Sequence, residues 1–281
     1  MIRLGLIGFP VSHSLSPKIQ NAALKVCGLE GEYSLFPIVP DDMQALKDLL
    51  DRVRSGEITG FNVTIPHKQN VIPFMDELTP TAKTIGAVNI IYLRENKLIG
   101  DNTDAAGFLS DLKKFLVESP SPKMGEGVGV RGKSALVLGA GGSARSVVYA
   151  LCNDGWSVTV AARRIEQAQQ LASQFEGVSA MELTFQTFQL SNLQLIVNTT
   201  PLGMTPNMNQ SPLPQNAILL SHMMIYDLVY NPRETKLVRD AWAQGLHATT
   251  GLGMLIEQAA LGFELWTGHQ LPGEIFRNAA E

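Results

Sequence analysis

Residues Lys133–Ala144 read K-S-A-L-V-L-G-A-G-G-S-A, and this stretch decides the fold of the second half of the chain. Its first six residues form a short apolar run typical of a strand, and a helical segment follows from Arg145. The glycines between them match the G-x-G-x-x-A fingerprint, which combines a tight turn, close approach of a pyrophosphate and close helix packing. The sequence therefore predicts a dinucleotide-binding loop formed by Gly139, Ala140, Gly141, Gly142, Ser143 and Ala144.

The end of the next expected strand, at residues 156–162, indicates which dinucleotide binds. NAD sites place Asp or Glu there to bind the ribose 2′-hydroxyl. This chain has Arg163 and Arg164, whose guanidinium groups would bind a 2′-phosphate through charge-assisted hydrogen bonds, so NADP is the expected cofactor. A solvated arginine pair is the competing interpretation. Thr199 and Thr200, after an apolar strand at 193–197, fit close approach of a cofactor or an ordinary turn.

Strand-like and helix-like segments alternate along all 281 residues, which favours an α/β fold with mostly parallel sheets. We expect two domains: a three-layer substrate-binding domain at 1–102, completed by about 252–281, and a Rossmann domain at 103–251. A proline- and glycine-rich stretch at 118–132 is interpreted as a linker or loop. In the first half, strands are expected at 2–8, 32–38, 58–65, 86–93 and 97–100, and helices at 17–27, 42–54, 68–84 and 104–117.

The last long helix, about 253–266, is expected to pack back onto the first domain. Residues at i, i+3 and i+4 spacing give it one apolar face that includes Met254, Leu255, Leu261 and Leu265. Gln258 is the one polar residue in that face. It is either a boundary position in contact with water or a ligand contact.

Bulk properties exclude several classes of function. The formal net charge of −4 and the pI of about 5.8 argue against binding to nucleic acid or to an anionic membrane. No apolar run approaches the roughly 20 residues that span a bilayer, and residues 1–8 do not resemble a signal peptide. Cys27 and Cys152 show neither metal-ligand spacing nor a disulfide framework. We expect a cytoplasmic protein with free thiols and no metal site.

The run N-V-T-I-P-H-K at residues 62–68 is a polar cluster at the end of an expected strand. Alternation along a strand points Asn62 and Thr64 to the same face. Pro66 interrupts the ladder, which places Lys68 beyond the carboxyl end, where open α/β sheets bind ligands. Amide, hydroxyl and ammonium groups together suit a ligand rich in hydroxyls.

Two further polar clusters also follow expected strands. Ser14 and Ser16 precede a helix that begins at Pro17, so Ser16 is expected to cap it, and hydroxyls at a helix N-terminus also fit a carboxylate ligand. The third cluster joins Gly86–Asn89 to Gly100–Asp104, where Thr103 or Asp104 is expected to cap a helix.

In combination and in order, these blocks resemble those of shikimate dehydrogenase over nearly the whole chain. One departure is in the segment after the second strand of the dinucleotide-binding half. The family's N-R-T-x-x-R is here Ala162 to Gln167, which keeps the first arginine and has Arg164 in place of the threonine. The matching motifs are S-x-S-P at 14–17, N-V-T-x-P-x-K at 62–68, G-A-V-N at 86–89, D-N-T-D at 101–104, G-A-G-G-x-A at 139–144, N-T-T-P-L-G-M at 198–204, D-L-V-Y-N-P at 227–232 and G-L-G-M-L-x-x-Q at 251–258.

The resemblance implies reversible, NADPH-dependent reduction of 3-dehydroshikimate to shikimate, in the route to aromatic amino acids. It implies Lys68 and Asp104 as the catalytic pair. The small-molecule substrate is the expected partner, and the chain is expected to be a monomer or a homodimer. The other implied contacts are Ser14, Ser16 and Tyr230 on the substrate carboxylate, Asn62, Thr64, Asn89 and Gln258 on the ring hydroxyls, Gly251 and Met254 against the nicotinamide, and Leu228 on the cofactor.

Two alternatives remain open at this point. One is a quinate/shikimate dehydrogenase that uses NAD or both cofactors. The other is a shikimate-binding regulator without catalysis, which the intact Lys68–Asp104 pair and the glycine loop disfavour. We expect Lys68 to protonate the substrate oxygen with Asp104 orienting it, and the sequence leaves open whether Lys68 is chiefly a proton shuttle or a positioned charge.

Overall fold

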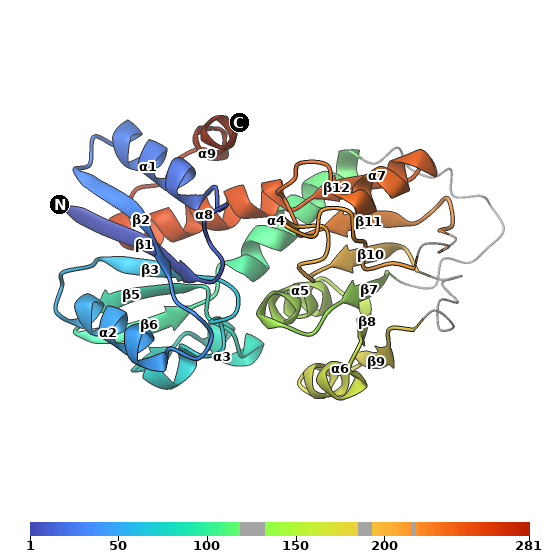
Figure 1. Ribbon diagram of the computed structural model, residues 1–281, viewed down its shortest axis with the longest axis horizontal. Helices are drawn as coiled ribbons and strands as arrows, with labels where there is room; N and C mark the ends of the chain where they lie inside the picture. Colours follow the sequence, from blue (N-terminus) through green and yellow to red (C-terminus); the bar gives the residue numbers. More distant parts are fainter. Residues whose placement is uncertain (119–132, 185–192, 215–216, 218) are drawn as a thin grey trace. The chain divides into compact units, whose positions relative to one another are not determined.

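The computed structural model describes residues 1–118, 133–184, 193–214, 217 and 219–281 (Figure 1). It divides into two compact units, the first formed by residues 1–107 with 255–281 and the second by residues 108–254. Apart from Glu118, the predicted linker at 118–132 lies outside the described residues.

The first unit is built on a six-stranded sheet in the order β2-β1-β3-β5-β6-β4. β1 pairs in parallel with β2 and β3, whereas β3–β5 and β5–β6 are antiparallel. The antiparallel pair β5–β6 is joined by Glu95 and Asn96, both with positive φ, as a tight hairpin turn requires. β4 pairs in parallel with β6, so the sheet is mixed, with three parallel and two antiparallel strand pairings. Its strands are β1 (Ile2–Gly8), β2 (Gly31–Pro37), β3 (Gly60–Val63), β4 (Glu77–Leu78), β5 (Ile90–Arg94) and β6 (Lys97–Asp101).

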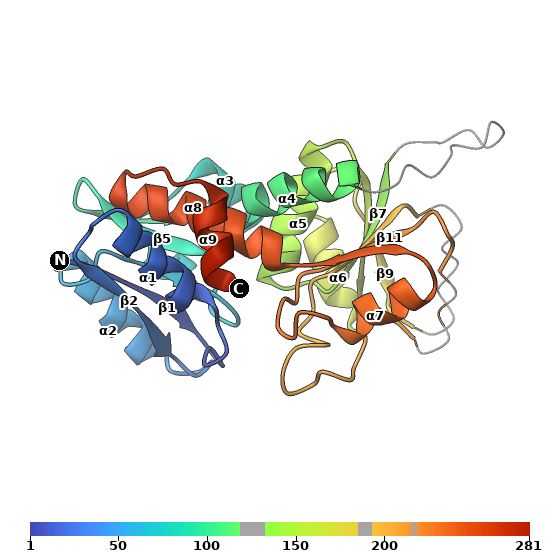
Figure 2. The ribbon, with the colours of Figure 1, turned by 90° about the horizontal axis from the view of Figure 1, so that it is seen from above.

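Helices cover both faces of this sheet (Figure 2), which confirms the predicted three-layer arrangement. Neighbouring residues of a strand point to opposite faces, so Ile91 joins the core under α2 while Ile90 joins the core that contains Trp266 of α8. The helices of this unit are α1 (Ser16–Val26), α2 (Met43–Arg54), α3 (Pro80–Ile85), α9 (Gly273–Ala280), the 3-10 helix η1 (Ile72–Phe74) and most of α8 (Leu252–Thr267).

α8 packs back onto the first sheet, as expected, and Trp266 anchors it there. The indole Nε1 of Trp266 donates to the carbonyl oxygen of Ile91 at 3.1 Å. The ring lies where Gly60 has no side chain, since a Cβ on Gly60 would be 2.3 Å from Nε1. The predicted apolar face was wrong at two positions: Leu261 and Leu265 are 36% and 42% exposed. The buried side of α8 is instead formed by Ile256, Gln258, Ala259, Phe263 and Trp266.

The helix predicted at 68–84 was also wrong. The segment forms turns, the short η1, the two-residue β4 and only then α3. Pro73 and Pro80 explain the difference, because proline removes a backbone donor and is accepted only in the first turn of a helix. Pro80 opens α3, which Thr79 caps by accepting a hydrogen bond from Ala82 N at 3.2 Å.

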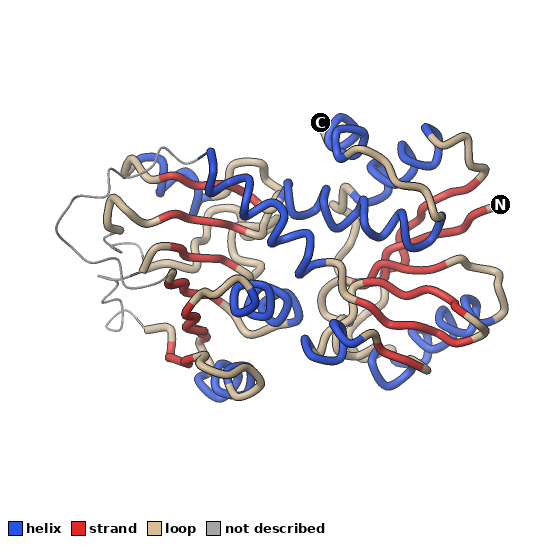
Figure 3. The backbone as a smooth tube through the Cα atoms, turned by 180° about the vertical axis from the view of Figure 1, so that it is seen from behind, coloured by secondary structure: helices blue, strands red, loops and turns tan. Residues whose placement is uncertain are grey.

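The second unit is a fully parallel six-stranded sheet in the order β12-β11-β10-β7-β8-β9. Figure 3 shows its strands in red and the helices beside them in blue. In chain order this is 3-2-1-4-5-6, the doubly wound order of dinucleotide-binding folds, which confirms the predicted Rossmann fold. The order reverses between β7 and β10. The elements are β7 (Ser134–Leu138), β8 (Ser157–Ala162), β9 (Ser179–Glu182), β10 (Leu195–Asn198), β11 (Met224–Asp227), β12 (His247–Thr250), α5 (Gly142–Asn153), α6 (Ile165–Ala172), α7 (Lys236–Ala243) and most of α4 (Asp104–Glu118).

Both cysteines, Cys27 and Cys152, are half-buried free thiols. Within the described part of the chain, no helix has the length and hydrophobicity needed to cross a bilayer. The same residues contain no cluster of three or more His, Cys, Asp or Glu side chains that could hold a metal ion.

We predict that Trp266→Ala lowers the free energy of unfolding by about 3–5 kcal/mol, because it empties a buried site and removes the bond to Ile91. Urea denaturation followed by circular dichroism measures the loss. Trp242→Ala is the matched control: Trp242 is 47% exposed, so its loss should cost about 1 kcal/mol. Equal losses in the two variants would contradict the anchoring role of Trp266.

Candidate functional site

A buried ion pair joins Lys68 and Asp104 in the first unit. Lys68 Nζ lies 2.6 Å from Asp104 Oδ2, and the side chains are 11% and 7% exposed. Asp104 is the first residue of α4, where the positive end of the helix dipole also favours a carboxylate. Burying two charges is costly unless they are paired and hydrogen-bonded, so this arrangement requires further support from its neighbours.

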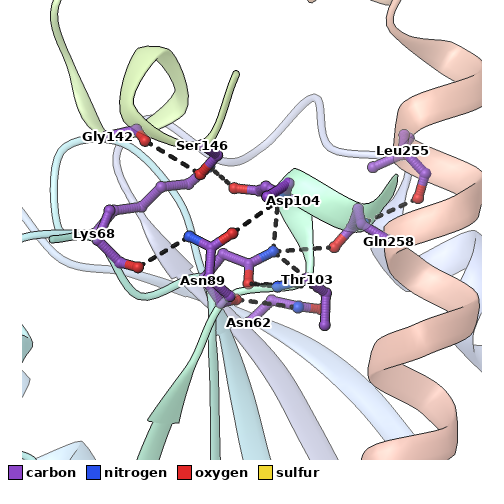
Figure 4. A network of polar contacts seen from close by, with 12 residues as sticks. Asn62, Lys68, Asn89, Thr103, Asp104, Gly142, Ser146, Leu255 and Gln258 are labelled. Carbon is purple, nitrogen blue, oxygen red and sulfur yellow. Dashed lines mark hydrogen bonds and ion pairs between the residues drawn. The ribbon is translucent and has the colours of Figure 1, made fainter. Parts of the chain in front are cut away.

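Asn89 provides that support (Figure 4). Its amide nitrogen donates to Asp104 Oδ1 at 2.8 Å and to Thr103 Oγ1 at 3.0 Å, and its Oδ1 accepts from Thr103 N at 2.7 Å. The amide is also 3.5 Å from Gln258 Oε1. Asn89 thus uses its donors within the protein and fixes both the carboxylate and the start of α4.

The chain between β3 and Lys68 forms a turn that fixes the lysine backbone. His67 N donates to Thr64 O at 2.9 Å, and Val88 N donates to Lys68 O at 2.8 Å. His67 is fully buried and its Nε2 lies 2.7 Å from Ile38 O. Because a carbonyl only accepts, Nε2 carries the proton. His67 is therefore a structural residue that orients the segment leading to Lys68.

Asn62 and Thr64, both predicted substrate ligands, border this turn. Asn62 Oδ1 accepts from the hydroxyl of Tyr33 at 2.8 Å, and Asn62 Nδ2 donates to Asn89 O at 3.2 Å. One N–H and one lone pair of Asn62 remain for a ligand. β3 ends at Val63, two residues earlier than expected, and Thr64 Oγ1 has no protein partner among the described residues. Tyr33, which sequence reasoning missed, holds Asn62 in place.

Ser14 and Ser16 come together at the start of α1. Ser14 Oγ donates to Ser16 Oγ at 3.1 Å and accepts from Ser16 N at 3.2 Å. The prediction that Ser16 caps α1 was wrong: Ser16 is itself the first helical residue, because Ser14 already accepts its backbone N–H. The Ser16 hydroxyl can therefore donate to an anion at the positive end of an 11-residue helix.

The cap of α4 also differs from the expectation. Asn102 Oδ1 accepts from Ala105 N at 3.2 Å, so Asn102 makes the bond expected of Thr103 or Asp104. The amide of Asn102 also donates to Ala87 O at 2.9 Å. This frees the Asp104 carboxylate to face Lys68.

Gln258 lies on the buried side of α8 and is 8% exposed, so it is not a solvent-exposed boundary residue. Its Nε2 donates to Leu255 O at 2.9 Å and its Oε1 faces Asn89. α8 and α4 meet closely here, since a Cβ on Gly107 would lie 2.8 Å from Gln258 N. Gln258 therefore joins the same polar network as Lys68 and Asp104.

The glycine loop of the second unit fits a dinucleotide. Gly139 has φ +110°, and a Cβ there would lie 2.7 Å from Thr199 Oγ1. A Cβ on Gly141, which caps α5, would meet nothing within 4 Å, so the backbone is open to a ligand at the helix N-terminus. Ala140 completes the turn, Gly142 and Ser143 are the first two residues of α5, and the fully buried Ala144 packs α5 on the sheet.

The neighbouring loop after β10 is held by a buried carboxylate that sequence reasoning missed. Asp227, fully buried at the end of β11, accepts from Asn198 Nδ2 at 2.8 Å, Val229 N at 3.0 Å and Thr235 Oγ1 at 2.6 Å. Asn198 Oδ1 in turn accepts from the backbone and the hydroxyl of Thr200. Burial raises the pKa of Asp227 to about 6, although these hydrogen bonds act to lower it.

The remaining predicted contacts belong to the second unit. Arg163 and Arg164 follow β8 and are exposed. A Cβ on Gly251 would lie 2.2 Å from Leu228 O, so these two predicted cofactor contacts are adjacent. Met254 is buried in the first turns of α8, and Tyr230 is half-buried after β11. The predicted ligand roles of these residues stay predictions.

Fold and site together define a class of protein. A Rossmann sheet with a G-x-G-x-x-A loop is combined, in one chain, with a unit that carries a buried lysine–carboxylate pair among amides and hydroxyls. These are the features of a dinucleotide-dependent oxidoreductase that acts on a polar, hydroxyl-bearing molecule.

Comparison with known proteins gives the family. Residues 6–91 match the model of the shikimate dehydrogenase substrate binding domain, residues 124–236 the shikimate / quinate 5-dehydrogenase model, and residues 251–281 the shikimate 5′-dehydrogenase C-terminal domain. The chain belongs to the shikimate dehydrogenase family.

Individual relatives match over nearly the full length. Shikimate dehydrogenase (NADP(+)) of Carboxydothermus hydrogenoformans is 41% identical over 98% of this chain and 95% of its own. The enzyme of the same name from Methanopyrus kandleri is 38% identical over 98% and 93%. The crystal structure of shikimate 5-dehydrogenase from Thermus thermophilus, in complex with NADP(H) and shikimate, superposes with a TM-score of 0.84 at 38% identity, over 100% of this chain and 98% of that one.

The raised pKa of Asp227 predicts a pH-dependent contribution to stability. The folded state binds this proton more tightly than the unfolded state, whose pKa is near 3.8. The stabilisation is complete below about pH 4 and is lost as the pH rises through about 6. Relative to Asp227→Asn, the wild-type protein should lose on the order of 3 kcal/mol of unfolding free energy between these limits. Urea denaturation at several pH values measures the difference, and a pH-independent difference would refute the prediction.

Proposed function

We propose that Lys68 and Asp104 form the catalytic pair with which this NADP-dependent shikimate dehydrogenase reversibly reduces 3-dehydroshikimate to shikimate. The observation that carries the assignment is the buried 2.6 Å ion pair, held in place by Asn89. Family membership supports the reaction, and the relatives named above are NADP-dependent shikimate dehydrogenases.

The polar groups around the pair suit this substrate. Ser14 and Ser16, at the N-terminus of α1, offer hydroxyls and a helix dipole to the carboxylate, and Tyr230 is the third proposed ligand of that group. Asn62 keeps one free N–H and Thr64 a free hydroxyl for the ring hydroxyls. Asn89 and Gln258, whose hydrogen bonds are largely made within the protein, order these groups.

Lys68 manages the charge and the proton of the reaction. NADPH, held by the loop of Gly139 to Ala144, would supply a hydride for the carbonyl carbon. Negative charge then develops on the carbonyl oxygen, and the ammonium of Lys68 stabilises that charge and delivers a proton to the oxygen. The resulting neutral amine regains a proton from solvent. Asp104 holds Nζ in one position through the whole cycle, so little reorganisation is needed at the moment of transfer.

Lys68→Ala should lower kcat by about 10³-fold while the KM for shikimate changes by less than about tenfold. The reason is that the ammonium acts on the developing charge rather than on the bound ground state. Steady-state oxidation of shikimate by NADP⁺, followed as reduced nicotinamide, measures both constants.

Two controls accompany this experiment. Lys97→Ala removes an exposed lysine of the same unit and should leave both constants unchanged. Circular dichroism shows whether the Lys68 variant folds, since Asp104 is left without its partner. A folded Lys68→Ala enzyme with near-normal kcat would contradict the assignment of Lys68 as a catalytic residue.

We assign recognition of the 2′-phosphate of NADP to Arg163 and Arg164. Both guanidinium groups are exposed directly after β8, where NAD-binding folds place an acidic residue. The loop of Gly139 to Ala144 holds the pyrophosphate, and Thr199, Thr200 and Leu228 line the cofactor.

Arg163→Ala combined with Arg164→Ala should raise the KM for NADP⁺ at least about tenfold and leave the KM for NAD⁺ within twofold, because only the 2′-phosphate contact is lost. Kinetics with the two cofactors at fixed shikimate give the ratio. An equal change for both cofactors would show that the arginines do not read the 2′-phosphate.

Quinate is the alternative substrate, because the model that matches residues 124–236 describes both shikimate and quinate enzymes. Parallel assays with the two compounds separate them. We also propose a monomeric or homodimeric cytoplasmic enzyme, and the two free thiols, Cys27 and Cys152, suit a reducing compartment.

A further inference from the structure

The first turn of α8 lies against a carboxylate of α4 that no role described so far explains. A Cβ built on Gly253 would lie 1.8 Å from Asp111 Oδ1 and 2.4 Å from Asp111 Oδ2. Asp111 is 9% exposed, and both residues belong to the second unit. Any side chain at position 253 would therefore displace the carboxylate.

Electrostatics favours this position for a negative charge. The first four N–H groups of a helix have no partner within the helix, and the helix dipole is positive at that end. α8 begins at Leu252, so Gly253 lies within this first turn. The glycine allows the Asp111 carboxylate to approach the helix backbone directly.

Tyr226 fixes the carboxylate from the other side. Its hydroxyl donates to Asp111 Oδ2 at 2.5 Å, and the residue is fully buried. The Tyr226 ring meets Phe108 and Phe115 edge-on, at centroid distances of 5.1 and 6.0 Å. These rings leave Tyr226 little freedom, so Asp111 is held between β11 and the start of α8.

The same turn of chain carries two of the residues assigned to the cofactor. Gly251 lies against the backbone of Leu228, with Gly251 N donating to Val229 O at 3.4 Å. Met254 is the residue after Gly253 and is 7% exposed. The segment 251–254 is thus fixed by the end of β11 on one side and by Asp111 on the other.

We propose that Asp111, fixed by Tyr226, holds the first turn of α8 and so positions Gly251 and Met254 against the nicotinamide end of the cofactor. Asp111 is a positioning residue, because it acts through α8. The inference rests on the proposed function in one respect, the assignment of residues 251 and 254 to the nicotinamide.

The test compares two ligands that share the adenosine 2′-phosphate but differ in the nicotinamide. Tyr226→Phe removes only the hydroxyl, Asp111→Asn removes the charge, and Gly253→Ala displaces the carboxylate. Each should raise the Kd of NADPH about fivefold or more, by fluorescence titration, and leave the Kd of adenosine 2′,5′-bisphosphate within twofold. Asp240→Asn, in the same unit but paired with Lys236 within α7, is the matched control and should change neither Kd.

Kinetics supply a second measurement. In Tyr226→Phe, kcat for shikimate oxidation should fall about tenfold and the KM for shikimate should stay within twofold. In the reverse reaction, the primary deuterium isotope effect measured with 4-deuterated NADPH and 3-dehydroshikimate should rise, because misplacement slows hydride transfer itself. An equal rise in the Kd of both ligands, or an unchanged Kd of NADPH in all three folded variants, would overturn the inference. Lack of shikimate oxidation by the wild-type protein would instead refute the proposed function, and the affinity ratio would still test Asp111.

Discussion

A lysine ammonium that is nine-tenths buried requires an opposite charge beside it, and the first unit is arranged around meeting that requirement for Lys68. The charge comes from Asp104, and the position of Asp104 depends on where α4 begins. That start is set by Asn102, which caps the helix, and by Asn89, which binds Thr103 and the Asp104 carboxylate. Loss of any one member would leave a charge or an amide unsatisfied in a buried setting.

The second unit contains a buried carboxylate in a different environment. Asp227 is surrounded by neutral donors, and burial raises its pKa to about 6, whereas Asp104 has a cation as its partner. Asp227 ties the ends of β10 and β11 together through Asn198, and the loop after β10 lies against Gly139. One buried carboxylate is thus paired with a cation, in the arrangement that we propose for catalysis, and the other is held by neutral donors and joins the strand ends beside the glycine loop.

Much of the fold was predictable because it depends on local patterns. The strand–glycine loop–helix unit at 133–153 and the alternation of strands and helices along the chain follow from residue spacing. The failures occurred where tertiary contacts decide. Leu261 and Leu265 have helical spacing that fits a buried face, yet α8 is rotated so that Trp266 fills the gap at Gly60. Pro73 should have limited the predicted helix at 68–84.

The motifs identified the residues of the site but not the bonds among them. Ser16 was expected as a cap, whereas the neighbouring Ser14 accepts its N–H. Tyr33 and Asp111 lie far in sequence from Asn62 and Gly253, the residues that they contact, so no spacing rule points to them. Asp227 is the first residue of the D-L-V-Y-N-P motif, and that motif was the one feature of the sequence that pointed to it.

The most direct test of the central claim is a crystal structure of the protein with shikimate and NADP⁺ bound. The account predicts that Lys68 Nζ keeps its contact with Asp104 Oδ2 and also lies within hydrogen-bond distance of the substrate hydroxyl that is oxidised, with Asn89 still bound to Asp104. A complex in which Lys68 points away from that hydroxyl, or in which Asp104 binds the substrate without Lys68, would contradict it.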